Sequence, residues 1–182
     1  MKIMSRLKRS RRQTGFTLIE VGIVLALMGV ALFFTLSKMS ANSDQTRSQN
    51  FVSDFSGIVT DAKRLYATQQ AYTGVTIAIL RDNNVFPATW NVGGTVTGPW
   101  TGAVTTAAAT LVTAGDGLTI TVPNIPQGVC SDIVRAMASG VDVISVAGTN
   151  VKAFQNTINL ATTGTQCASA ANVSIAFTFG KM

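Results

Sequence analysis

The sequence contains no histidine, and only 12% of its 182 residues are charged. The absence of histidine excludes Ser-His-Asp triads, histidine metal sites and imidazole general bases. No other nucleophile–base pair, metal-ligand cluster or phosphate-binding loop stands out, so we expect neither an enzyme nor a bound cofactor or metal. The low charge and the 47% hydrophobic content are typical of a chain with one segment in a membrane.

Cysteine is also scarce, because the chain contains only Cys130 and Cys167. The two residues are far apart in the sequence, which excludes a C-x-x-C redox motif. Composition alone allows either one disulfide or two free thiols.

Positive charge is concentrated at the N-terminus. The chain has 14 Lys and Arg against 8 Asp and Glu, a formal net charge of +6. Six of the cations precede residue 13, and the remainder of the chain is formally neutral. A nucleic-acid-binding domain would spread its cations over a folded surface, so we expect no nucleic-acid partner. The six cations are Lys2, Arg6, Lys8, Arg9, Arg11 and Arg12.

A long apolar run, FTLIEVGIVLALMGVALFFTL, follows this leader at residues 16–36. As a helix it would measure about 31 Å, which matches a hydrocarbon core of about 30 Å. The preceding cations should stay cytoplasmic and place the rest of the chain on the other side. The run is longer than the apolar region of a secretory signal peptide, and no A-x-A-like site follows it. It therefore predicts a membrane-spanning helix.

Glu20 is the single charged residue of this run. An acid at the centre of a bilayer is unfavourable by about 2.5–3.5 kcal/mol, and by less near a membrane surface. Two interpretations follow: Glu20 is a functional residue of the apolar segment, or it lies close enough to the interface to reach the lipid headgroups.

The basic leader ending in Gly15, the string Phe-Thr-Leu-Ile-Glu at 16–20 and the apolar helix together resemble the class III signal of type IV prepilins. In that family a prepilin peptidase cleaves after the glycine, the new N-terminus is methylated, and the fifth mature residue is glutamate. The resemblance implies that residues 1–15 are a cleaved leader. It also implies that Phe16 is N-methylated and that Glu20 acts in assembly.

Cleavage after Gly15 would remove all six leader cations and create one new charge, the amine of Phe16. When such helices stack in a filament, Glu20 of one subunit can pair with the amine of a neighbour, so that a buried charge is compensated. One buried polar pair specifies axial register better than apolar packing does.

Beyond Lys38 the apolar residues recur at spacings of three and four, as in an amphipathic helix. Together with the apolar run they predict one helix over 16–69, with 16–38 in the membrane and 39–69 packed on a globular head at 70–182. The apolar positions of the second half are Phe51, Phe55, Ile58, Val59, Ala62, Leu65 and Tyr66.

Two segments of the head are ambiguous by pattern. Residues 75–84 fit either a strand or a short helix, and the resemblance to pilins favours the helix. Residues 87–117 are rich in Gly, Thr and Ala and predict a loop-rich connection with one or two short strands. Trp90 and Trp100 in that connection either bind a ligand or anchor the loop to the core, and anchoring is the commoner role.

The patterns of the other head segments predict strands and one helix. Residues 118–122 alternate in polarity up to Pro123, which predicts a half-buried strand, and 141–147 and 173–179 predict further strands. Pro126 opens a helix. A long helix followed by antiparallel strands predicts an α+β fold. The inner face of the shorter helix comprises Val129, Ile133, Val134 and Met137.

The segments around Cys130 and Cys167, LTITVPNIPQGVCSDIV and QCASAANVSIAFTFGK, resemble the C-terminal cysteine region of type IVb pilins. That subclass includes the toxin-coregulated and bundle-forming pilins and the thin pili of conjugative plasmids. On the non-cytoplasmic side of a membrane a lone cysteine pair is most simply a disulfide. Such a bond stabilises by about 3–4 kcal/mol in the chain-entropy model. We expect it to bound the region 130–167 and to tie it to the last strand.

These expectations combine into a structural subunit of a type IV pilus, processed to 167 residues. The expected partners are other copies of the chain, prepilin peptidase, the pilus assembly machinery and, before assembly, the inner membrane. The extracellular filament would serve adhesion, aggregation or conjugation. The alternatives are a pseudopilin of a type II secretion system and a single-pass membrane enzyme or receptor.

N-terminal sequencing separates the processed proteins from the last alternative. We expect the protein purified from a host with prepilin peptidase to begin at Phe16 with a methylated amine, because the leader ends at Gly15. The same protein from a host without the peptidase should begin at its original N-terminus. An uncleaved leader in both hosts would support a permanent membrane protein.

Overall fold

The computed structural model describes residues 18–181, and for residues 34–42 it describes the backbone only. The chain divides into two compact units, residues 1–40 and 41–182. The helix α1 (Leu18–Leu65) runs through both units, and the other elements of the described residues all lie in the second unit. The second unit is called the head below.

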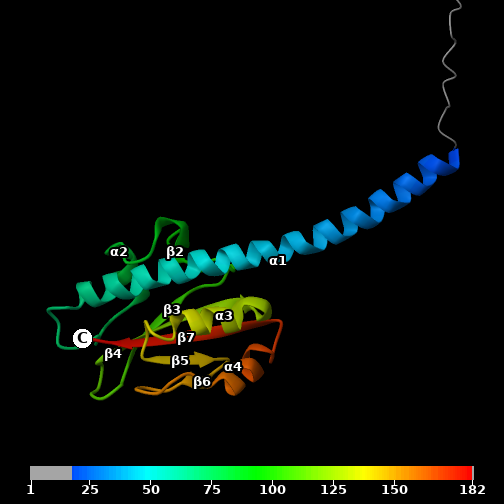
Figure 1. Cartoon of the computed structure of the whole chain (residues 1–182). Helices are drawn as coiled ribbons and strands as arrows, with labels where there is room; N and C mark the ends of the chain where they lie inside the picture. Colours follow the sequence, from blue (N-terminus) through cyan, green and yellow to red (C-terminus); the bar gives the residue numbers. More distant parts are fainter. Residues whose placement is uncertain (1–17, 182) are drawn as a thin grey trace, which may run out of the picture. The chain divides into compact units, whose positions relative to one another are not determined.

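The head contains a five-stranded antiparallel sheet with the strand order β3-β4-β7-β5-β6 (Figure 1). The last strand in the sequence, β7, lies at the centre between β4 and β5. Phe177 of β7 pairs with Ile120 on one side and with Ile144 on the other. The strands are β3 (Thr105–Ala109), β4 (Gly117–Pro126), β5 (Val143–Val146), β6 (Thr149–Lys152) and β7 (Asn172–Gly180).

One face of this sheet carries the core, and the second half of α1 and the helix α3 lie on that side (Figure 1). The rings of Phe55 on α1 and Phe177 on β7 are 4.6 Å apart. The opposite face is rich in hydroxyl groups, as in the 2.7 Å hydrogen bond between Thr119 and Thr178. The sheet residues that are buried on the core side include Leu118, Ile120, Val122, Ile125, Ile144, Val146, Val173, Ile175, Phe177 and Phe179.

The shorter helices begin where the sequence supplies a cap or a proline. Thr76 accepts a hydrogen bond from the amide of Ile79 at the start of α2, and Asn159 accepts one from the amide of Thr162 at the start of α4. Pro126 directly precedes α3. The remaining elements are α2 (Ile77–Asp82), a 3₁₀ turn (Ala88–Trp90), β1 (Asn91–Val92), β2 (Thr95–Val96), α3 (Gln127–Met137) and α4 (Leu160–Cys167).

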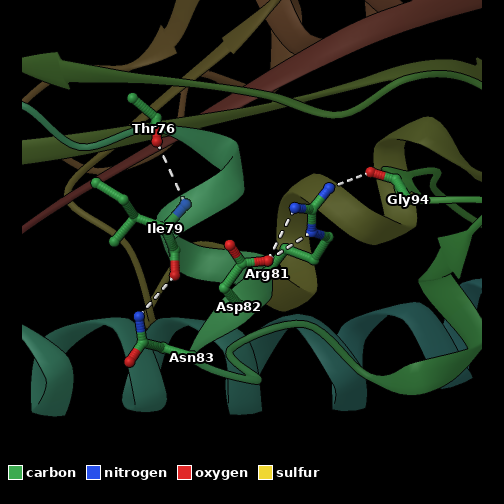
Figure 2. A network of polar contacts seen from close by, with 6 residues as sticks. All are labelled: Thr76, Ile79, Arg81, Asp82, Asn83 and Gly94. Carbon is green, nitrogen blue, oxygen red and sulfur yellow. Dashed lines mark hydrogen bonds and ion pairs between the residues drawn. The ribbon is translucent and has the colours of Figure 1, made fainter.

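The connection between α2 and β3 is fixed by a polar network (Figure 2). Arg81 of α2 donates to the carbonyl oxygen of Gly94 in the β1–β2 turn and pairs with Asp82 at 2.8 Å. Gly93 and Gly94 have φ values of 58° and 82°, the left-handed conformation that glycine adopts without steric cost. Arg81 thus joins the hairpin turn to α2.

Two tryptophans anchor the same connection to the core, as expected. Trp90 and Trp100 are 2% and 7% exposed. Their rings lie 5.7 Å and 5.4 Å from that of Phe51 on α1. Both therefore pack on the core, in the anchoring role.

The α+β fold, the long helix and the buried face of α3 are confirmed. The predicted strand end at Pro123 is wrong, because β4 continues to Pro126 with a register shift between Val122 and Ile125. A strand tolerates proline at such an irregularity, where no ladder hydrogen bond from its nitrogen is needed. The connection contains three short strands instead of one or two, and the sequence patterns did not reveal β3, β6 or α4.

Truncation of the central aromatic contact tests this architecture. We expect Phe55→Ala to destabilise the head by about 3–5 kcal/mol, because it removes a fully buried ring from the contact between α1 and β7. Ser56→Ala, at the neighbouring exposed position, should change stability by less than about 0.5 kcal/mol. Denaturant unfolding of the detergent-solubilised proteins measures both, and equal midpoints would contradict the packing described above.

Candidate assembly site

The first half of α1 presents an apolar surface within its own unit. Between residues 18 and 33 the large apolar side chains are 44–94% exposed. A contiguous exposed surface of this kind marks a site of contact with a partner or a lipid phase. The side chains are Leu18, Ile19, Val21, Ile23, Val24, Leu25, Leu27, Met28, Val30, Leu32 and Phe33.

Glu20 lies exposed in the first described turn of α1. A negative charge at this end of a helix interacts favourably with the helix dipole. Gly22 and Gly29 follow on the same helix, and a Cβ added at either would meet nothing within 4 Å. Gly15 and Phe16, the predicted cleavage and methylation positions, lie outside the described residues.

No helical stretch in the described part of the chain combines the length and the apolar character that a membrane crossing requires. The membrane-spanning role expected for residues 16–38 stays a prediction.

The expected disulfide is present between Cys130 and Cys167, with the two Cα atoms 5.7 Å apart. Both cysteines are buried. The bond joins α3 to the end of α4, so the expectation that it ties this region to the last strand is wrong, because β7 begins only at Asn172. The bond instead holds two helices together across the region 130–167.

Lys152 provides a second tie in the same region. From β6 its ammonium group donates hydrogen bonds to the carbonyl oxygens of Ala138 and Val141, just after α3. A cation near a helix C-terminus interacts favourably with the unpaired carbonyls there. Nothing in the sequence pattern indicated this role, because the partners are backbone atoms brought close only by the fold.

Asp116 organises the loop before β4. Its carboxylate accepts hydrogen bonds of 2.7–2.8 Å from the amides of Leu111, Val112 and Thr113. The amides of Leu111 and Thr113 lower the pKa of Asp116 most, because they stabilise its charged form. The carbonyl oxygen of Asp116 accepts from the amide of Lys181, so this loop also holds the end of β7.

Tyr72 and Asp142 lie near that end of β7 as well. Burial raises the pKa of Tyr72 to about 12, and the negative charge of Asp142 adds to the effect. Asp142 accepts a 2.7 Å hydrogen bond from the amide of Gly180. Tyr72 and Asp142 thus stabilise the end of β7. Among the described residues, no cluster of three or more His, Cys, Asp or Glu side chains is suited to hold a metal ion.

The α+β head, the central last strand and the N-terminal motif together define a type IV pilin-like protein. Within that class the chain belongs to the family described as PilS N terminal, whose model matches residues 45–179. A second model, the prokaryotic N-terminal methylation motif, matches residues 10–36. The two matches together cover the end of the predicted leader, most of the predicted helix and nearly all of the head.

Among characterised proteins, the chain is similar to the major structural subunit of bundle-forming pilus from Escherichia coli O111:H-. The two are 24% identical over 169 residues, which cover 90% of this chain and 87% of the relative. Type II secretion system core protein G from Vibrio cholerae is 25% identical over 92 residues, covering 48% of this chain and 63% of the relative. The pilus subunit therefore matches far more of the chain.

Solved structures support the fold. The type IVb pilin from Salmonella typhi has a TM-score of 0.54 and 16% identity, and the match covers 72% of this chain and 99% of that one. TcpA, a type IV pilin from Vibrio cholerae El Tor, has a TM-score of 0.56 and 15% identity, with 73% and 98% covered. At these identities the comparison shows the fold alone.

The depressed pKa of Asp116 predicts a dependence of stability on pH. A carboxyl group with a lowered pKa in the folded state stabilises fully above about pH 4, and the contribution is lost as the pH falls through the folded value. We expect Asp116→Asn to melt at a lower temperature than wild type at pH 7, with a difference that shrinks towards pH 2. Thermal melting at both pH values measures this, with the exposed Asp132→Asn as control. A constant difference would contradict the charged role.

Proposed function

We propose that the chain is the structural, non-catalytic subunit of an extracellular type IV pilus. The observation that carries this proposal is the change from exposed to buried apolar side chains along α1. Its first half exposes apolar side chains, and its second half contributes buried side chains to the core of the head. Exposed apolar surface of that extent requires a lipid phase or other copies of the same helix. A pilin would bury this surface in the lipid bilayer while it is a membrane protein, and against other copies of the helix once it is part of a polymer.

In the proposed precursor, residues 16–38 anchor the chain in the inner membrane with the leader in the cytoplasm and the head in the periplasm. Prepilin peptidase removes residues 1–15 by cleavage between Gly15 and Phe16, and the amine of Phe16 is then methylated. The match of the methylation motif to residues 10–36 supports both steps.

In the proposed filament the apolar halves of α1 bundle at the centre and the heads cover them. Glu20 pairs with the amine of Phe16 from a neighbouring copy. An unpaired charge in this apolar centre would be strongly unfavourable, so only registers that form the pair are stable. The amphipathic half, residues 39–69, anchors each head to its helix, and the disulfide-bounded region 130–167 stabilises the head outside the cell.

The similarity to a bundle-forming pilus subunit over 90% of the chain favours this function over that of a pseudopilin, for which the match covers 48%. At the cell surface the filament would serve adhesion, aggregation or conjugation. Cryo-electron microscopy of filaments sheared from cells that express the chain tests the proposal as a whole. A short periplasmic assembly without surface filaments would support the pseudopilin.

Substitution of Glu20 tests the assembly step. We expect Glu20→Val to be inserted and cleaved normally but to yield no sheared filaments, because the amine of Phe16 loses its partner. Glu20→Asp keeps the charge on a shorter side chain and should retain part of the yield. Asp132→Asn, which removes an exposed acid from α3 in the head, serves as the control. Quantitative immunoblots of sheared and cell-bound fractions measure the result, and a normal yield from Glu20→Val would exclude the proposed pair.

A further inference from the structure

A groove of about 570 Å³ lies on one flank of α1, between its last turns and the C-terminal end of α3. Val59 and Met137 line it and are 7% and 1% exposed, so its floor is apolar and belongs to the core. The other lining residues are Ser56, Thr60, Lys63, Arg64, Ala67, Gly140 and Lys181.

The groove carries three cations, Lys63, Arg64 and Lys181, and no acid lines it. Arg64 pairs with Asp61 at 3.1 Å, but its side chain is 81% exposed. Within the described part of the chain, the side chains of Lys63 and Lys181 have no acidic partner. Cations in the last turn of α1 offset the helix dipole. Lys181 follows β7 and is not part of α1, so the dipole does not account for the whole cluster.

The acidic residues of the head fall into two groups, those with an ion pair or hydrogen bond and those with neither. Three form ion pairs with a neighbouring arginine, and two accept backbone hydrogen bonds. Asp44 and Asp54 alone have no hydrogen bond or ion pair to any described residue, and both lie on α1 before the groove. The satisfied acids are Asp61, Asp82 and Asp132 in ion pairs, and Asp116 and Asp142 at backbone amides.

Asp54 and the groove lie on opposite flanks of α1. Nine residues separate Asp54 from Lys63, which is about two and a half helical turns and thus a half-turn of rotation. Asp54 lines a different hollow of about 540 Å³ together with Arg47, Pro87 and Trp90. A contact between opposite flanks joins copies head to tail and generates an open helical assembly, whereas a contact between equal flanks closes a dimer.

The charges that the two flanks offer are complementary in sign. Arg47, Asp54 and Asp61 recur every seven residues and therefore lie on one flank of α1, which carries both acids, whereas the groove on the opposite flank carries only cations. If two parallel copies are offset by ten residues, about 15 Å, Asp54 of one lies level with Arg64 of the other.

We propose that the cationic groove of one copy receives the Asp54 flank of the next copy in the filament, with Lys63 and Arg64 paired to Asp54. This inference rests on the proposed function, because it requires a polymer with parallel helices. The contact would provide a second charge pair that fixes the axial position of neighbouring copies. It lies in the heads and does not involve Glu20. The apolar floor around Val59 and Met137 is then covered in the filament.

Charge reversal of the full-length chain, in cells that form filaments with the wild-type protein, tests the contact. We expect Lys63→Glu and Asp54→Lys each to lower the yield of sheared filaments at least tenfold, and the double variant to restore it. Arg135→Glu, an exposed cation on α3 away from the groove, is the matched control and should leave the yield unchanged. Cell-bound protein and melting temperature verify that each variant folds.

Co-expression of the two single variants in one cell is the decisive experiment, and the yield of sheared filaments is again the quantity measured. Subunits that alternate in a mixed filament would form only matched contacts, so the two variants together should assemble although neither does alone. No effect inside one subunit can produce that rescue.

Three results would overturn the inference: normal filaments from both single variants, no recovery in either the double variant or the co-expression, or loss with Lys63→Glu but not with Asp54→Lys. The last result would assign the groove to an anion other than a second copy. Wild-type cells without surface filaments would instead contradict the proposed function, so the two failures are distinct.

Discussion

The contact between the aromatic face of α1 and the central strand β7 is the constraint on which the rest of the head depends. Phe51 and Phe55 lie against Phe177, and Trp90 and Trp100 pack on Phe51 in turn. The sheet has one covered face, on which both α1 and α3 lie. A single helix therefore combines two tasks, because the same element that completes the core carries the apolar surface for assembly.

The main elements of the fold could be predicted because their physical signals are local. The three-and-four spacing that includes Phe55 and Ala62 identified the packed half of α1, and strict alternation ending at Phe179 identified β7. Pro126 located the start of α3 to the residue. The candidate assembly residue Glu20 was recognisable for the same reason, since one acid in an apolar run is visible without any tertiary information.

The remaining features depend on contacts distant in sequence. The strand β3 consists of Thr and Ala, which have no apolar alternation, and it is a strand only because β4 offers it a partner. Lys152 and Asp116 interact with backbone atoms, which every residue possesses, so no side-chain pattern indicates them. The strand β4 passes Pro123 because its pairing with β7 resumes at Ile125. The second element that the disulfide joins could not be predicted, because α4 is a short polar helix without a clear apolar period.

The position of β7 has a consequence for how the head acquires its structure. Of the described strands it is the last in sequence, yet β3-β4 and β5-β6 meet only through it. Until β7 inserts, these are two separate hairpins with open edges and an exposed apolar face, and two-stranded hairpins are marginal in water. The pairing of β7 with both hairpins joins segments distant in sequence, and such long-range β pairing is slow as a rule. A chain interrupted before residue 172 cannot form the sheet, which makes completion of synthesis a condition for surviving proteolysis.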